Sequence, residues 1–540
     1  MTTPSPSKTA LPSDTSAHRR QAASRPQRQV LSWVLLLAAI ALFSYHSQMY
    51  WQWTEDDAFI SLQYARNLTE GHGLVFNPGE RVEGYSNFSW VILASVVMKA
   101  GGDPLVWIKV FGLLAGMGCL VLSWVLVRLL VPGVGLLALL APWYLAVSPV
   151  LTQHSTSGLE SSMFAFLLIA SLVLAAPSRT LRLAERGLLV LLLVLLGMTR
   201  PEGAAVALVL LLVRAASLGR AEGSGWQRSL LQIRGELAGF LLLFVIWYAW
   251  RWNYFGLPFP NPFYAKAQGG LHSIIDGTQY TLDFLRDGGG PIFFGVGFAP
   301  LLAGRMRPVT WMALGILTTY LAFVVIAGGD WMWNYRFFSH VIPVIAALTA
   351  AGFEIILAKS SAGSWRTLGL YSALSLLLLT TMVGMANTEM RMARIVLPAI
   401  RSHNYLSQNY EELGVWLKEN TDADVTVAIS DVGAIAYYSE RRILDMFGLN
   451  DRHIAAQKGR MHYKADPSYV LSKKPEIIIL LSLNDQGDGY SFQRVPDYAI
   501  NALPEFHEQY QLIRTVPQHW QNEFALIYQR QAIQQKGEAP

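Results

Sequence analysis

Long apolar stretches constrain the fold of this 540-residue chain more than any other feature. Residues 30–45, 106–131 and 368–385 are each long enough, or nearly so, to cross a hydrocarbon layer of about 30 Å as a helix. Only 15% of the residues are charged, whereas soluble domains carry about 25%. The sequence therefore predicts a mostly α-helical, polytopic membrane protein. It excludes an aqueous enzyme, a nucleic-acid-binding protein and a fibrous chain.

About eleven apolar segments are candidate membrane-spanning helices. They lie at residues 30–47, 105–131, 134–151, 158–176, 187–199, 203–217, 236–254, 290–303, 308–327, 336–358 and 367–386. Bulky Met49, Tyr50 and Trp51 follow the first segment in place of a small-residue cleavage site, so we expect an uncleaved first span rather than a signal peptide. Residues 1–29 are rich in Ser, Thr, Pro and basic side chains, which predicts a disordered tail.

Basic residues are distributed unevenly between the two sides of the predicted bundle. They are frequent in the N-terminal tail and in every second connecting segment after it, and sparse in the others. Because basic segments stay cytoplasmic, we expect a cytoplasmic tail and a transmembrane module of residues 30–386. The first outer loop of that module covers residues 48–104, and residues 387–540 form an extracytoplasmic domain.

The C-terminal 387–540 region has a different composition. Charged residues return, and short apolar runs at residues 425–430 and 477–482 predict strands between helical or turn-rich stretches. We therefore expect a small α/β-like domain. The single cysteine, Cys119, lies in an apolar block, so the sequence predicts neither an internal disulfide nor a cysteine metal cluster. No nucleotide-binding pattern follows a strand.

Charged residues that are costly to place at a membrane boundary gather in the predicted outer loops. They are Asp56 and Asp57, Glu160, Arg200, Lys266, Asp330 and Arg336. If these loops share one membrane face, their acids and bases line one cavity. Such basic groups suit a lipid phosphate, with arginine making bidentate contacts and lysine acting as a point charge. His154 has no second histidine at ligand spacing, so we expect a polar loop residue rather than a metal ligand.

The same residues could instead have structural roles, without any part in a functional site. Thr54 and Asp57 have the spacing of a capping box, so the acids could simply begin an amphipathic helix over residues 54–70. Because adjacent helical residues point about 100° apart, only one of Asp56 and Asp57 is expected to face a substrate. Glu160 could start the fourth span, and basic side chains near span ends commonly reach toward lipid headgroups.

Seven short motifs from about residue 50 to 460 are informative together. They are Glu55-Asp56-Asp57-Ala58-Phe59-Ile60, Val82-Glu83-Gly84-Tyr85-Ser86-Asn87, Ser157-Gly158-Leu159-Glu160, Thr199-Arg200-Pro201-Glu202-Gly203, Asn261-Pro262-Phe263-Tyr264-Ala265-Lys266, Gly328-Gly329-Asp330-Trp331 and Ser430-Asp431-Val432-Gly433. This set resembles the GT-C superfamily of polytopic glycosyltransferases. The closer resemblance is to the bacterial branch typified by the mycobacterial terminal β-(1→2)-arabinofuranosyltransferase.

The resemblance implies a fold, an activity and a set of site residues. The enzyme would transfer a sugar, with arabinofuranose as the first candidate, from a polyprenyl-phosphate donor to a glycan, glycolipid or protein acceptor. The transfer would invert the configuration at the anomeric carbon. Asp56 would be the general base with Asp57 in support, and the donor phosphate or sugar would be bound by Glu160, Arg200, Lys266, Asp330 and Arg336. The enzyme would be a multi-pass protein of the bacterial inner membrane with a periplasmic C-terminal domain. No cofactor is required, although a divalent ion beside Asp56, Asp57 and Glu160 stays open.

Two alternatives to arabinofuranosyl transfer remain. A GT-C enzyme could transfer another lipid-linked sugar such as mannose or aminoarabinose, because the branches of a superfamily differ more readily in the sugar that they transfer than in their scaffold. A flippase for lipid-linked sugars belongs to a different class, but it would favour polar residues near the membrane midplane rather than at one face. The C-terminal domain could be a carbohydrate-binding module or a lid.

Overall fold

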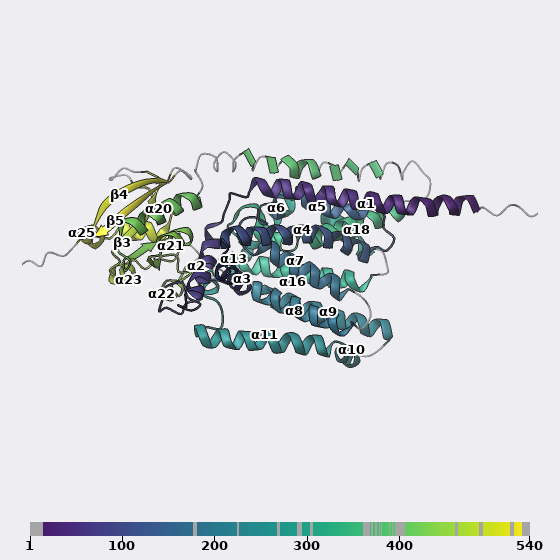
Figure 1. Cartoon of the computed structure of the whole chain (residues 1–540), viewed down its shortest axis with the longest axis horizontal. Coiled ribbons are helices and arrows are strands. Elements are labelled where there is room, and N and C mark those ends of the chain that lie inside the picture. Colours follow the sequence, from purple (N-terminus) through teal and green to yellow (C-terminus); the bar gives the residue numbers. More distant parts are fainter. Residues whose placement is uncertain are drawn as a thin grey trace, which may run out of the picture.

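The computed structural model is mainly helical, with a small sheet domain at one end of a helical bundle (Figure 1). It describes residues 15–176, 181–223, 226–266, 270–288, 294–302, 306–359, 406–459, 463–484, 490–518 and 523–531, together with scattered residues between 368 and 394. We call the end of the bundle that carries the sheet domain the domain end. The N-terminal part of the first helix extends beyond the opposite end (Figure 1).

The bundle consists of long apolar helices that run side by side (Figure 1). They are α1 (Thr15–Met49), α4 (Pro104–Leu130), α7 (Ser161–Ala175), α8 (Leu183–Thr199), α9 (Glu202–Glu222), α11 (Arg234–Phe255), α16 (Pro308–Ala327) and α18 (Ile342–Lys359), with the short α10 (Trp226–Gln232) between α9 and α11. Among the described residues, four helices are long and apolar enough to cross a membrane, or five if one bent pair is a single span. The structure thus confirms a polytopic helical architecture, while the count of eleven spans stays a prediction.

Three predicted spans differ from single straight helices. Residues 134–151 form a 3-10 helix (Leu136–Leu139), α5 (Leu140–Val147) and α6 (Pro149–Thr152), because Pro149 lacks the N–H that would continue α5. Residues 336–358 contain α17 (Arg336–Ser339) and α18, and the helical segments on either side of this break are bent by 75°. Within residues 290–303, the longest described helix is α15 (Ala299–Leu302). The last predicted span, 367–386, lies largely outside the described residues.

The C-terminal domain is a five-stranded sheet covered by short helices. Its elements are α20 (Leu406–Asn420), β1 (Thr426–Ile429), α21 (Gly433–Ser439), β2 (Arg442–Asp445), α22 (Arg452–Ala455), α23 (Pro467–Ser472), β3 (Ile477–Ser482), α24 (Val495–Asn501), α25 (Pro504–Gln509), β4 (Tyr510–Gln518) and β5 (Glu523–Arg530). The strand order is β2-β1-β3-β5-β4, with β1 parallel to β2 and β3, and β5 antiparallel to β3 and β4. The predicted strands at residues 425–430 and 477–482 are confirmed as β1 and β3.

The first loop and the C-terminal domain share one hydrophobic core. The loop contributes α2 (Asp56–Thr69) and α3 (Phe88–Lys99), and the core joins their apolar residues to those of α20, α21, β1 and β3. The Phe59 ring in α2 lies 5.7 Å from the ring of Tyr437 and 5.5 Å from that of Tyr438. Polar contacts cross the same boundary, since Asn77 exchanges two hydrogen bonds with the backbone of Ile443 at 2.8 and 3.0 Å. The domain is therefore packed into the loop rather than tethered to it.

Replacing Phe59 tests this shared core. The ring is 2% exposed, so Phe59→Ala should lower the free energy of unfolding by about 3–5 kcal/mol through lost burial and a cavity. The loop and the C-terminal domain should unfold in one transition at a lower temperature, measured by thermal denaturation in detergent. Phe298→Ala is the matched control because that ring is 51% exposed. A separate domain transition that Phe59→Ala leaves in place would contradict a shared core.

Candidate active site at the domain end

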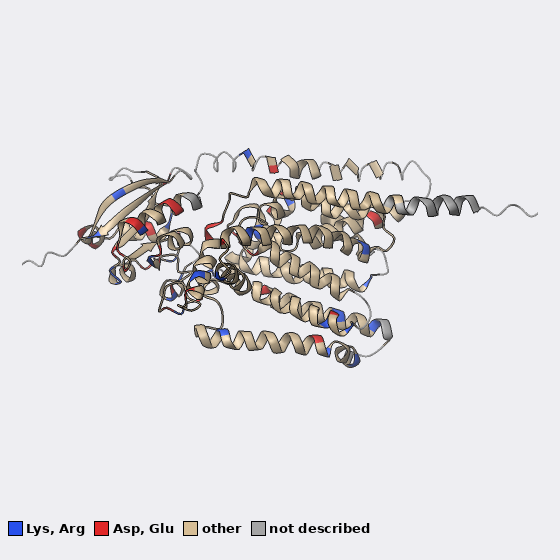
Figure 2. Cartoon of the chain, viewed as in Figure 1, with Lys and Arg blue, Asp and Glu red and all other residues tan. Residues whose placement is uncertain are grey.

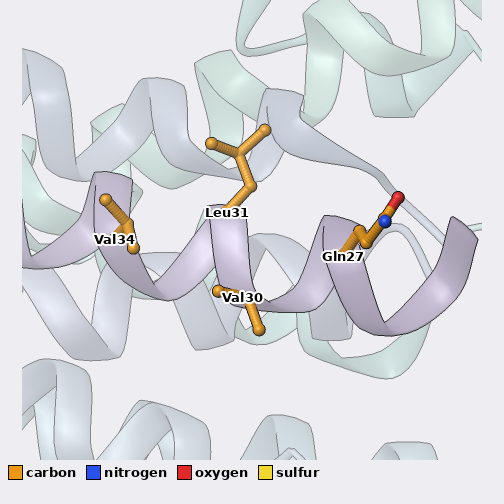
Figure 3. Close-up of a pocket in the computed structure, with 4 residues that line it drawn as sticks. All are labelled: Gln27, Val30, Leu31 and Val34. Carbon is orange, nitrogen blue, oxygen red and sulfur yellow. The ribbon is translucent and has the colours of Figure 1, made fainter.

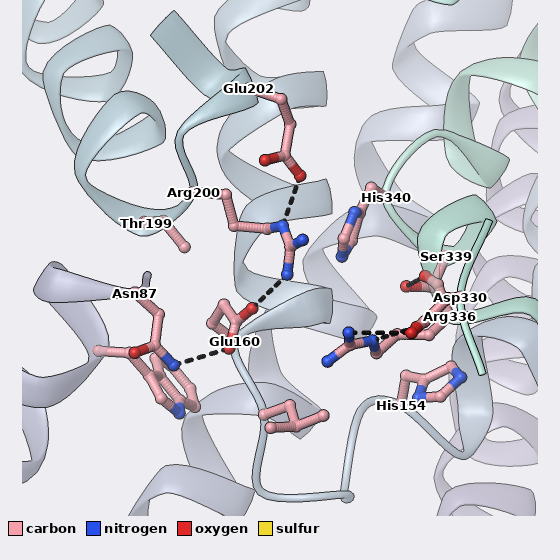
Figure 4. A network of polar contacts seen from close by, with 12 residues as sticks. Asn87, His154, Glu160, Thr199, Arg200, Glu202, Asp330, Arg336, Ser339 and His340 are labelled. Carbon is pink, nitrogen blue, oxygen red and sulfur yellow. Dashed lines mark hydrogen bonds and ion pairs between the residues drawn. The ribbon is translucent and has the colours of Figure 1, made fainter. Parts of the chain in front are cut away.

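Charged residues concentrate toward the two ends of the bundle, and the helical segments between them carry few (Figure 2). At the domain end, the loops that connect the helices bring together acids and bases that lie far apart in the sequence. Figure 4 shows the centre of this network. The structure thus places six of the seven predicted site residues on one group of buried or half-buried charges, and it directs the seventh, Asp56, into the C-terminal domain.

Arg200 sits between two carboxylates (Figure 4). Its Nη1 lies 2.6 Å from Glu160 Oε1 and its Nε lies 2.5 Å from Glu202 Oε1, with all three side chains 4–8% exposed. The other carboxylate oxygen of Glu160 accepts a hydrogen bond from Asn87 Nδ2 at 2.8 Å. The Glu160 carboxylate is therefore held by one guanidinium and one side-chain amide.

The sequence Thr199-Arg200-Pro201 explains how Arg200 reaches this position. Helix α8 ends at Thr199, and Arg200 adopts an extended conformation with φ −155° and ψ 143°. A residue before proline is disfavoured in the helical region, so the chain must leave the helix here. The resulting turn between α8 and α9 carries the guanidinium into the network instead of along a helix surface.

A second ion pair joins Asp330 to Arg336. The Arg336 Nε lies 2.5 Å from Asp330 Oδ2 and its Nη2 lies 3.3 Å from Oδ1, with the two side chains 6% and 3% exposed. The chain reaches this pair through Gly328 and Gly329, whose φ angles of 85° and 77° suit glycine. A Cβ on Gly329 would lie 2.7 Å from the ring of Tyr280. His154 packs beside this pair, with Nε2 3.0 Å from the carbonyl oxygen of Trp333.

Asp57 and Lys266 are different from these paired residues. Both are half-buried, and within the described part of the chain neither side chain has a hydrogen-bond or ion-pair partner. Lys266 ends α12 (Asn261–Lys266). Burial lowers its pKa, and the charges of Asp57 and Asp330 oppose that shift. An unpaired carboxylate and an unpaired ammonium therefore act on each other in one polar region.

Asp56 points to the C-terminal domain instead. Its Oδ2 accepts the backbone N–H of Gly433 and its Oδ1 accepts that of Ala434, both at 2.8 Å. Burial and the nearby Asp431 raise the pKa of Asp56 to about 7, although the two backbone N–H groups act in the opposite direction. The predicted capping box is absent, since the N-cap of α2 is Glu55 and no side chain caps it. Asp56 is thus engaged by the C-terminal domain while Asp57 is not, and the expectation that only one of the two acids faces a substrate stays a prediction.

Two residues that sequence reasoning did not select hold the start of α2. The Lys109 ammonium donates to the carbonyl oxygens of Trp51 and Trp53 at 2.6 and 2.8 Å. The Glu55 carboxylate accepts the indole N–H of Trp53 at 3.0 Å. Lys109 carried a usable signal, because a lone charge inside an apolar block needs a specific partner. Glu55 carried none beyond its place in the acidic run.

A shallow, open apolar pocket on the surface lies elsewhere. It is lined by Gln27, Val30, Leu31 and Val34 on α1, toward the end of the bundle opposite the C-terminal domain (Figures 1 and 3). Its apolar side chains are exposed along a helix that is apolar enough to cross a membrane. It offers no acid or base and is separate from the charged network.

Comparison with solved structures identifies the fold. An oligosaccharyltransferase from Archaeoglobus fulgidus, solved with a tethered acceptor peptide, superposes with a TM-score of 0.54 at 11% identity, over 84% of this chain and 69% of that one. ArnT from Cupriavidus metallidurans, solved with undecaprenyl phosphate, superposes with a TM-score of 0.51 at 12% identity, over 92% and 97%. This chain has the GT-C fold. In this chain, the charged network lies at the end of the helical bundle that carries the C-terminal domain.

Sequence comparison narrows the relationship within GT-C proteins. The terminal β-(1→2)-arabinofuranosyltransferase of Mycobacterium tuberculosis is 32% identical over 261 residues, which cover 45% of this chain and 39% of that enzyme. The match thus spans about two fifths of the length of this curated relative. Residues 399–534 match a family described as a domain of unknown function, DUF8728.

The buried Glu55 carboxyl predicts an unusual pH dependence of stability. Burial raises its pKa to about 7, so the folded state binds this proton more tightly than the unfolded state. The stabilisation is fully present below the unfolded pKa and is lost as pH rises through about 7. Compared with wild type, Glu55→Gln should therefore gain stability from pH 5 to pH 8, by at most about 3 kcal/mol.

Denaturant unfolding at pH 5, 6, 7 and 8 measures this difference. Glu419→Gln is the matched control, because that exposed carboxylate is in water in both states. A Glu55→Gln variant that loses stability relative to wild type as pH rises would contradict the assignment.

Proposed function

We propose that this chain is an inverting glycosyltransferase that moves arabinofuranose from a polyprenyl-phosphate donor to a glycan, glycolipid or protein acceptor. The observation that carries the proposal is the Asp57 carboxylate near the Lys266 ammonium inside a GT-C fold, where neither group has a hydrogen-bond or ion-pair partner among the described residues. A neighbour of the same fold was solved with undecaprenyl phosphate, and the sequence relative is an arabinofuranosyltransferase. The first supports a polyprenyl-phosphate carrier, and the second supports arabinofuranose as the sugar.

Asp57 is our candidate for the general base, in place of Asp56. A base needs a free lone pair within hydrogen-bond reach of the acceptor hydroxyl. Both carboxylate oxygens of Asp56 accept backbone N–H groups of the C-terminal domain. Asp57 has no such partner among the described residues, and it follows Asp56 directly at the start of α2.

Lys266 is our candidate for the group that neutralises the departing phosphate. Arg200 and Arg336 already have carboxylate partners at 2.5–2.6 Å, so much of their charge is offset before substrate binds. The Lys266 ammonium can approach a phosphate oxygen without breaking an ion pair. In this arrangement Arg200 and Arg336 fix the loops and contribute to the local field, while Glu160 and Asp330 hold the two guanidinium groups in place.

The proposed reaction is a single displacement. The acceptor oxygen attacks the anomeric carbon and loses its proton to Asp57, while the bond between that carbon and the phosphate oxygen breaks. The polyprenyl phosphate leaves with the bonding electrons and is stabilised by Lys266. Attack opposite to the leaving group inverts the configuration. Because a monophosphate can be neutralised by basic side chains, the proposal assigns no step to a cofactor.

The proposal includes a membrane location. The chain would lie in the bacterial inner membrane with its N-terminus in the cytoplasm, as the distribution of basic residues suggests. The domain end, with the charged network, would then face the periplasm. A network at that end would meet the phosphate of a lipid donor at headgroup level, which supports a lipid-linked donor over a soluble one.

Purified protein tests the proposed activity. Incubation with decaprenyl-phosphoryl-arabinofuranose and a mixed oligosaccharide acceptor should release decaprenyl phosphate and form a new glycoside. Asp57→Asn should lower kcat by about 10²- to 10⁴-fold, because it removes the base. Lys266→Gln should lower kcat/KM by roughly 10²-fold, because it removes stabilisation of the leaving phosphate. Asp422→Asn, at an exposed position of the C-terminal domain, is the matched control.

The outcomes separate the alternatives. Turnover of a mannosyl or aminoarabinosyl lipid in place of the arabinosyl lipid would replace the donor and keep the mechanism. Full activity of Asp57→Asn would remove Asp57 from the chemistry. Transport of lipid-linked sugar across liposomes without turnover of any donor would establish a flippase instead of an enzyme.

A further inference from the structure

The C-terminal domain forms hydrogen bonds with Asp56, which is the first residue of α2 and immediately precedes the proposed base. We infer that Asp56 is a positioning residue that clamps α2 to α21 and thereby makes the C-terminal domain a required part of the active site. This inference rests on the proposed function, because it assigns the chemistry to Asp57. It gives Asp56 a role in which the carboxylate never exchanges a proton with the acceptor.

The geometry of the contact is specific. The two carboxylate oxygens of Asp56 each accept one backbone N–H at 2.8 Å, from Gly433 and from Ala434. Amides in the first turn of a helix have no acceptor within their own helix. Asp56 therefore supplies, from another segment of the chain, the acceptors that the first turn of α21 lacks.

Glycine is the only residue type at position 433 that allows this close approach of Asp56. A Cβ at this position would lie 2.0 Å from the backbone oxygen of Asp56 and 2.6 Å from its Oδ2. Because the first of these atoms belongs to the backbone of α2, the helices would have to separate to admit a methyl group. Replacing this glycine is therefore a second way to disrupt the contact, from the side of the C-terminal domain and without changing Asp56 or Asp57.

The rest of α2 follows the same partner. Phe59 packs against the rings of Tyr437 and Tyr438, and the Arg66 guanidinium lies 3.7 Å from the centroid of the Tyr437 ring. These contacts extend over almost three turns of α2, from Asp56 to Arg66. Because α2 is bound to α21 along this length, the direction in which Asp57 points depends on the docked C-terminal domain.

A second carboxylate near the clamp is neutralised within the domain. Asp431 lies close enough to raise the pKa of Asp56. It accepts a hydrogen bond from Arg494 at 2.7 Å and another from the Tyr410 hydroxyl at 2.6 Å. Arg494 also pairs with Glu523 at 2.9 Å. The Asp431 carboxylate is therefore held in place, and the two N–H groups of α21 are left to Asp56.

Hydrogen exchange combined with kinetics tests the clamp. In the wild-type protein the amides of Gly433 and Ala434 should be protected, although amides at this position of a helix are otherwise open to water. Asp56→Asn and Gly433→Ala should each accelerate their exchange, or that of the remaining α21 amides, by about 10- to 100-fold, as expected for loss of a charge-assisted contact. Asp57→Asn should leave exchange in α21 unchanged.

Kinetics should show that the two clamp variants act through one contact. Asp56→Asn and Gly433→Ala should each lower kcat by about the same factor, and the double variant should be no worse than either single one. In both variants the remaining activity should still be abolished by Asp57→Asn, because Asp57 is still the base. Asp466→Asn is the matched control, since Asp466 caps α23 within the C-terminal domain through Tyr469 N–H at 2.9 Å.

The results distinguish failure of the clamp from failure of the proposed function. Loss of turnover in Asp56→Asn equal to that in Asp57→Asn, with unchanged exchange in α21, would overturn the clamp and make Asp56 the base. Unprotected amides at Gly433 and Ala434 in the wild-type protein would overturn it without any variant. If wild type turns over no lipid-linked sugar, the transferase proposal fails, and the exchange data still decide the clamp.

Discussion

The burial of ion pairs at the domain end is the constraint on which the rest of this structure depends. A buried charge without a partner costs several kcal/mol, and removing one member of a buried pair costs about 3–5 kcal/mol. Arg200 is shared by Glu160 and Glu202, and Arg336 is paired with Asp330. These partners come from the loops before α7, between α8 and α9, and after α16. The Arg200–Glu160 pair therefore joins two segments that no continuous helix connects, whereas the Arg200–Glu202 and Arg336–Asp330 pairs each stabilise the turn within one segment.

The arginines of this network are paired with carboxylates inside it, so the charged groups that remain without a partner mark the candidate site. Asp57 and Lys266 stand beside it without partners among the described residues, and unpaired charges of this kind are retained where chemistry requires them. The paired arginines supply a rigid frame and a balanced local charge, so the two unpaired groups can respond to a substrate. The division also explains why basic residues in one cluster need not share one role.

The sequence predicted the elements of this arrangement better than their contacts. Long apolar blocks identify the helices because burial in lipid requires apolar residues over the whole length, and β3 is visible because all six of its residues are buried. Strand β4 has a mixed pattern of exposure and gives no such signal. The motifs contain the candidate site residues, but the sequence of an acidic pair does not show which member faces the substrate. Only the position of Gly433, 377 residues away, shows that Asp56 is engaged.

The same contact between Asp56 and Gly433 bears on whether the C-terminal domain is an independent module. Its sequence family begins at residue 399 and ends at 534, which would suit an independent module that binds sugar or closes over the site. The packing argues against independence. Cut at that boundary, the domain would expose the apolar faces of α20 and α21 that complete the core of the first loop, and the amides of Gly433 and Ala434 would lose their acceptors. The loop would in turn lose the surface that orients α2. We therefore expect the first loop and the C-terminal domain to fold as one unit that extends beyond the boundary of the sequence family.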